Sequence, residues 1–96
     1  MRATGTFATP HASKYLQQLC KHFAHKVEVH HDTRQGTVAL PLGLAELTAD
    51  ATTLTVTVTA ADAEGIARAQ SVIDRHLVPF AFREAFERLD WQPAQP

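Results

Sequence analysis

The sequence lacks the features that mark several large classes of protein. Its only cysteine, Cys20, cannot form an internal disulfide, which fits a reducing compartment and predicts a cytoplasmic location. No apolar run approaches the roughly 20 residues of a membrane span, and the polar start lacks the apolar stretch of a secretion signal. We therefore expect no membrane partner. The four isolated glycines match no phosphate-binding loop.

A surplus of positive charge is also missing. Nine Lys and Arg stand against ten Asp and Glu, for a formal net charge of −1. A protein that neutralises phosphates needs a basic surplus on one face, so we expect no nucleic-acid partner.

The sequence also lacks a catalytic pattern. The acidic residues are scattered along the chain. Cys20 and His22 are two positions apart, where helical side chains do not face each other. We therefore interpret Cys20 as a half-buried apolar residue and predict no catalytic residue.

The 96 residues, 45% apolar and 20% charged, suit one domain over residues 1–96, with residues 92–96 as a flexible tail. Residues 3–9 favour a short strand. Thr9 and Pro10 suit the N-cap and first position of a helix. Apolar residues then recur at three- and four-residue spacing, which predicts a helix with one buried stripe. The stripe consists of Ala12, Tyr15, Leu16, Leu19 and Phe23.

Strands follow at residues 27–30, 37–40, 44–47 and 53–59, and the last of these alternates strictly between threonine and Leu or Val. Asp62 caps a second helix, and Pro79 should end it near Val78. The stripe of this helix is Ile66, Ala69, Ile73 and Leu77. We expect residues 80–86 to form a separate short helix and residues 89–91 a final edge strand or a docked tail.

These elements predict an α+β fold, a two-layer sandwich with an antiparallel sheet and both helices on one face. The order is β-α-β-β-β-β-α, which resembles the TATA-box-binding-protein-like topology. The other sheet face would stay open. It would carry the threonine row of residues 53–59 together with Glu28 and His30.

Six histidines are the main chemical feature of the sequence. His22 and His25 lie about 60° apart on one helix flank, and imidazole is a good ligand for transition metals. Glu28 and His30 follow on the next strand and are the nearest further donors, whereas His11 is about 16 Å away along the helix. We predict a metal site of His22, His25, Glu28 and His30. The competing interpretation is that these histidines are surface residues that complement a helix C-terminus.

Residues 19–26 read LCKHFAHK, which resembles the LCKHxxHK stretch of a bacterial domain-of-unknown-function family, number 2218. Residues 9–12 with Tyr15 and Leu16, and residues 76–84 with Trp91, resemble its beginning and its end. Pro79 departs from the polar residue that the family would place there. Similar domains occur fused to siderophore-interacting flavin reductases, so the resemblance implies a siderophore or iron-reduction partner by association alone. It implies no functional residues.

We therefore expect a small bacterial binding or accessory domain rather than an independent enzyme, with a transition-metal or iron-related ligand. Two alternatives stay open. A small-molecule binder or enzyme would use the threonine-lined sheet face, with Glu28 and His30 as polar contacts. A structural module would form a homodimer through a Phe-rich patch. For that patch we place Phe80 in the core and leave Phe82 and Phe86 undecided.

Overall fold

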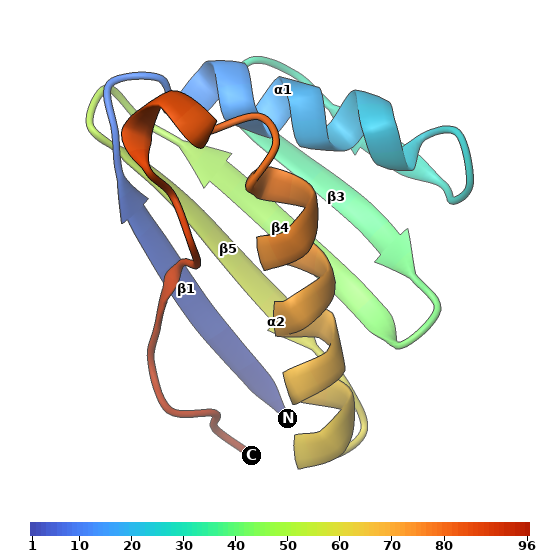
Figure 1. Ribbon diagram of the computed structural model, residues 1–96. Coiled ribbons are helices and arrows are strands. Elements are labelled where there is room, and N and C mark those ends of the chain that lie inside the picture. Colours follow the sequence, from blue (N-terminus) through green and yellow to red (C-terminus); the bar gives the residue numbers. More distant parts are fainter.

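The computed structural model describes all residues 1–96 and places two helices on one face of an antiparallel sheet (Figure 1). The elements in chain order are β1 (Arg2–Ala8), α1 (Ala12–Phe23), β2 (Val29–His31), β3 (Gln35–Leu40), β4 (Gly43–Ala49), β5 (Thr53–Thr59), α2 (Ala63–Leu77), a 3-10 helix η1 (Phe82–Glu84) and β6 (Asp90–Trp91). This confirms the predicted α+β class and element order. At 15 residues, the longest helix is too short to cross a bilayer, and no helix is long and apolar enough to do so.

The sheet has the strand order β2-β3-β4-β5-β1-β6, so the first strand lies between β5 and the last one. Of the predicted segment 89–91, Asp90 and Trp91 form an edge strand on β1, with Gly5 opposite Trp91. Residues 92–96, for which we expected a flexible tail, contain one more pairing. There Arg2 and Gln95 exchange two backbone hydrogen bonds of 2.8 Å.

The alternation along β5 decides which side of the sheet is buried. Leu54, Val56 and Val58 are completely buried against the helices, as predicted from the period of two. The threonines between them lie on the opposite face, where the strand register adds threonines of β1, β3 and β4. Eight threonines share this face: Thr4, Thr6, Thr37, Thr48, Thr53, Thr55, Thr57 and Thr59. The open sheet face is thus lined mainly by threonine.

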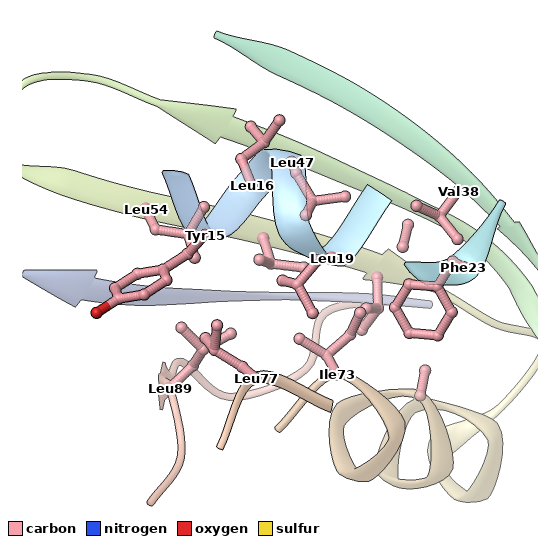
Figure 2. Packing of buried hydrophobic residues seen from close by; sticks show 14 of the residues in the cluster. Tyr15, Leu16, Leu19, Phe23, Val38, Leu47, Leu54, Ile73, Leu77 and Leu89 are labelled. Atoms are coloured by element: carbon pink, nitrogen blue, oxygen red, sulfur yellow. The ribbon is translucent and has the colours of Figure 1, made fainter. Parts of the chain in front are cut away.

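Both predicted helix stripes lie in the core, which Figure 2 shows as one cluster between α1, α2 and the sheet. Leu16 and Leu19 of α1 and Ile73 of α2 are fully buried. Leu89 from the C-terminal segment joins the same cluster. Tyr15 lies at its edge, and its hydroxyl points away from the other labelled side chains (Figure 2).

The predicted start of α1 was wrong by two residues. The helix begins at Ala12 with His11 at the N-cap, and no side chain caps it. Thr9 instead accepts a hydrogen bond from the His11 amide at 3.1 Å and donates to Glu84 at 3.0 Å. Its hydroxyl is therefore used in the turn before the helix.

The strand β2 also begins later than predicted, at Val29, because the Val27 amide still donates a hydrogen bond to the carbonyl of Phe23.

Cys20 is fully buried rather than half-buried, and it packs against Gly36 of β3. A Cβ atom at Gly36 would lie 2.7 Å from the Cys20 Sγ, so only glycine lets helix and strand approach this closely. Burial raises the pKa of the Cys20 thiol to about 11. A thiol in such surroundings is a packing residue and a poor nucleophile.

Pro79 ends α2 as predicted, because the helix stops at Leu77 with Val78 at its C-cap. The helix predicted over residues 80–86 is shorter than expected, since only Phe82–Glu84 form a 3-10 turn. Ala85 ends that turn in the left-handed region, with φ 54°. The chain thereby reverses, and Phe86 turns into the core while Phe82 stays 66% exposed.

Candidate functional site

A cleft of about 540 Å³ lies between α1 and the segment that follows α2. One wall comes from the first turns of α1, and the other comes from Pro79 through η1. The lining residues are His11, Lys14, Tyr15, Gln18, Pro79, Phe80, Phe82, Arg83 and Glu84. The volume falls within the range of small-molecule sites, and the cleft combines aromatic walls with converging polar groups.

Tyr15 and Glu84 form the floor of this cleft. The buried Tyr15 hydroxyl donates a hydrogen bond to the Glu84 Oε2, and the Thr9 hydroxyl donates to the same oxygen at 3.0 Å. Donation from Tyr15, together with Thr9 and the nearby His11 and Lys14, holds the pKa of Glu84 below its ordinary value. Burial, reinforced by the Glu84 carboxylate, raises the pKa of Tyr15 to about 12. At neutral pH the pair is therefore a neutral phenol on a charged carboxylate.

The rim of the cleft is cationic and aromatic. Lys14 and Arg83 lie on opposite walls, and His11 is at the helix start. The Arg83 guanidinium carbon lies 5.7 Å from the centroid of the exposed Phe82 ring. An incoming molecule would thus meet positive charge beside an accessible aromatic face.

Gln18 lines the same cleft and has an acceptor without a hydrogen-bond partner. Its Oε1 is buried and accepts no hydrogen bond in the structure. A buried acceptor without a donor is costly, because it loses its water and gains nothing in return. A ligand group that donates a hydrogen bond would remove that cost once the Gln18 side chain turns this oxygen toward the cleft.

The four residues predicted to share a metal ion lie on different elements of the structure. His30 and Glu28 contact each other, with Nε2 and Oε2 3.5 Å apart and both side chains mostly exposed. His22 lies instead against His76 of α2, and His25 is in the exposed turn after α1. No three His, Cys, Asp or Glu side chains gather closely enough to hold one ion. The four-residue metal site stays a prediction.

A second, shallower hollow of about 290 Å³ lies on the open sheet face at the β2–β3–β4 end. His30, Thr37 and Glu46 stand side by side across three strands. Leu47 is the only apolar residue among the nine that line the hollow. This hollow has the polar contacts of a binding site but lacks the apolar walls of the cleft.

The sequence interpretation missed the cleft, because Tyr15 and Glu84 are far apart in the chain. One signal was available. A tyrosine on a buried helix stripe needs a partner for its hydroxyl, so Tyr15 itself predicted a polar group facing the start of α1. Which residue supplies it depends on the turn at Ala85, and no sequence pattern indicated that turn.

Two comparisons with known proteins, one with a family model and one with solved structures, gave matches. A comparison with curated proteins gave no match. The chain is similar to PA4090 from Pseudomonas aeruginosa, solved by NMR, at 32% sequence identity and a TM-score of 0.81. That match covers 99% of this chain and 98% of the other. Residues 4–92 match the family DUF2218, described as an uncharacterized protein conserved in bacteria. The chain is therefore a member of the DUF2218 family.

Proposed function

We propose that this chain is a non-enzymatic binding domain that holds a small aromatic anion in the cleft between α1 and η1. The observation that carries the proposal is the convergence of three unlike groups in one cleft of about 540 Å³. These are the exposed Phe82 ring, the cations Lys14 and Arg83, and the Gln18 amide, whose buried oxygen has no hydrogen-bond partner.

The chemistry of the rim argues for a negative ligand. The two cations Lys14 and Arg83 outnumber the one carboxylate, Glu84. Two hydroxyls already donate to that carboxylate, which lowers its repulsion of a second anion. Phe80 and Phe82 supply surface for a planar ring, and Gln18 supplies an acceptor for a hydroxyl or amide donor on that ring.

The proposal is tested by titrating ¹⁵N-labelled protein with 4-hydroxybenzoate and, as a matched probe of opposite charge, 4-hydroxybenzylamine. We expect the anion to shift backbone signals of residues 11–18 and 79–85, and the amine to leave them unchanged. Lys14→Gln and Phe82→Ala should each lower the affinity for the anion. The matched controls are Lys26→Gln, which removes a charge elsewhere, and Leu44→Ala, which removes an exposed apolar group elsewhere. Neither control should change the affinity. Equal shifts by both probes, or shifts confined to the sheet, would contradict the proposal.

A second candidate is binding on the open sheet face, which the hollow beside His30 and Glu46 supports. Shifts confined to residues 30–48 in the same titration would favour it.

The proposed homodimer through a Phe-rich patch has weaker support. Phe86 is buried, Phe80 is partly buried against the core, and Phe82 is the one strongly exposed phenylalanine. Light scattering tests it, since a dimer through Phe82 should dissociate in Phe82→Ala.

A further inference from the structure

Two histidines from different helices lie together at a place that the cleft does not use. His22 is in the last turn of α1, and His76 is in the last turn of α2. Their ring centroids are 5.0 Å apart, and the planes are tilted by 50°. His22 is exposed and His76 half-buried, so the pair is accessible to solvent on one side.

The hydrogen bond of His76 fixes which of its nitrogens is free. Its Nδ1 lies 2.6 Å from the carbonyl oxygen of Val72. A carbonyl oxygen only accepts, so Nδ1 carries the hydrogen and a neutral ring keeps its lone pair on Nε2. Metal-binding histidines are commonly oriented in this way, with one nitrogen donating to a carbonyl and the other facing the ion.

The spacing of the rings also suits a shared ion. Metal–nitrogen bonds of about 2.0–2.1 Å at a tetrahedral angle put the centroids of two imidazole ligands about 5 Å apart. Phe23 packs on His76 with centroids 4.8 Å apart, and Phe80 lies 6.2 Å from His22. These aromatic neighbours limit the rotation of both rings.

The helix ends that carry His22 and His76 also favour a bound cation. Both histidines belong to the last turn of a helix, where the unpaired carbonyls give the negative end of the helix dipole. Lys21 and Arg75 are the adjacent cations and oppose a divalent ion. The attraction by the helix ends and the repulsion by these two cations together indicate moderate rather than tight binding of a metal ion.

We infer that His22 and His76 form a two-histidine site for a borderline transition-metal ion such as Zn²⁺, Cu²⁺ or Ni²⁺. Water would complete the coordination, since the chain offers no third ligand there. A bound ion would link the ends of α1 and α2. This site differs from the predicted set of His22, His25, Glu28 and His30, because its second ligand comes from the other helix.

The test is calorimetric titration of tag-free protein with Zn²⁺ and Cu²⁺ at pH 7.5, where imidazoles are neutral. We expect one site, weakened at least about tenfold in either of two variants. His76→Asn keeps a donor for the Val72 carbonyl, and His22→Phe keeps the ring packing, so both should fold. His11→Ala and His30→Ala are the matched controls and should bind as wild type.

Three results would overturn the inference. The first is that neither ion binds. The second is that His76→Asn binds the ion as tightly as wild type, which would mean that the two rings only pack together. Loss of binding in His25→Ala and His30→Ala, with His76→Asn unaffected, would assign the ion to the other set of residues. An increase of melting temperature by Zn²⁺ in wild type, absent in both site variants, would support the link between the helices.

Discussion

The Tyr15 hydroxyl on α1 donates a hydrogen bond to the Glu84 carboxylate, which lies 69 residues later in the chain. This contact joins the start of the first helix to the turn after the second, and it forms the floor of the cleft. Thr9 donates to the same carboxylate oxygen and so adds the end of β1 to the junction. Three segments that are distant in sequence therefore meet at one charged group.

Removing the hydroxyl should weaken this junction. We expect Tyr15→Phe to lower the free energy of unfolding by about 1.5–3 kcal/mol, the range for hydrogen bonds to charged groups. Urea unfolding at pH 7 measures it. Phe82→Ala, which changes an exposed ring on the same turn, should cost less than about 1 kcal/mol. Equal losses in the two variants would contradict the role of the Tyr15–Glu84 contact.

The same contact should make stability depend on pH at both ends of the scale. The pKa of Glu84 is lowered on folding, so its contribution is present above the unfolded value of about 4.3 and is lost as pH falls through the lower folded value. The pKa of Tyr15 rises from 10.0 to about 12, so its contribution is full below pH 10 and is lost between pH 10 and 12.

Urea unfolding between pH 3 and 7 and between pH 8 and 11 checks both slopes. Tyr15→Phe should reduce the acid slope, but a slope should remain, because backbone hydrogen bonds also lower the pKa values of Asp32 and Asp50. On the alkaline side a slope should remain, because the pKa of Cys20 also rises, from 9.0 to about 11. An alkaline slope that is unchanged in Tyr15→Phe would show that the tyrosine does not titrate differently in the folded chain.

The two faces of β5 should respond oppositely to charge. Val56→Asp places a carboxylate in the fully buried core and should unfold the domain, since its cost exceeds the few kcal/mol by which such a domain is stable. Thr55→Lys faces the open side and should change stability by less than about 1 kcal/mol. Circular dichroism and thermal melting distinguish the two. Similar destabilisation by both would contradict the open face.

Gly36 and Cys20 should be energetically coupled. Gly36→Ala puts a methyl group 2.7 Å from the Cys20 sulfur and should cost about 1–3 kcal/mol, the range for an overfilled core. Cys20→Ala makes room, so the double variant should be more stable than the sum of the single losses predicts. A double-mutant cycle measures this coupling. Strict additivity would show that the helix moves away from the strand instead.

The left-handed backbone at Ala85 gives a stabilising substitution. An L-residue in this region costs about 1–2 kcal/mol, which glycine avoids. After the larger unfolded-state entropy of glycine is subtracted, Ala85→Gly should raise stability by about 0.5–1 kcal/mol. Ala67→Gly, on the exposed side of α2, should lower it by about 1 kcal/mol. Loss of stability in both variants would contradict the backbone conformation assigned to Ala85.

Local patterns in the sequence predicted most of the fold. The threonine alternation of β5, the two apolar helix stripes and the break at Pro79 each depend on residues within one element, so periodicity and proline geometry were sufficient. The start of α1 was misplaced because Thr9 bonds to Glu84, a contact that no local pattern contains. The burial of Cys20 depended on Gly36 of another element in the same way.

The candidate site was less accessible to sequence reasoning. The histidine spacing around residue 22 suggested partners from the following strand, whereas the structure places His22 against His76 of α2. The angle between the two helices decides this, and that angle follows from the packing of the whole core. The cleft likewise depends on a chain reversal at an alanine, a residue type that carries no turn signal.

The most direct test of the proposed cleft is to locate a bound probe by intermolecular nuclear Overhauser effects. With 4-hydroxybenzoate on isotope-labelled protein, we predict contacts from the probe ring to the rings of Phe80 and Phe82 and to the side chain of Gln18. Contacts to the threonine methyl groups of β4 and β5, with none to Phe82, would contradict a binding site between α1 and η1.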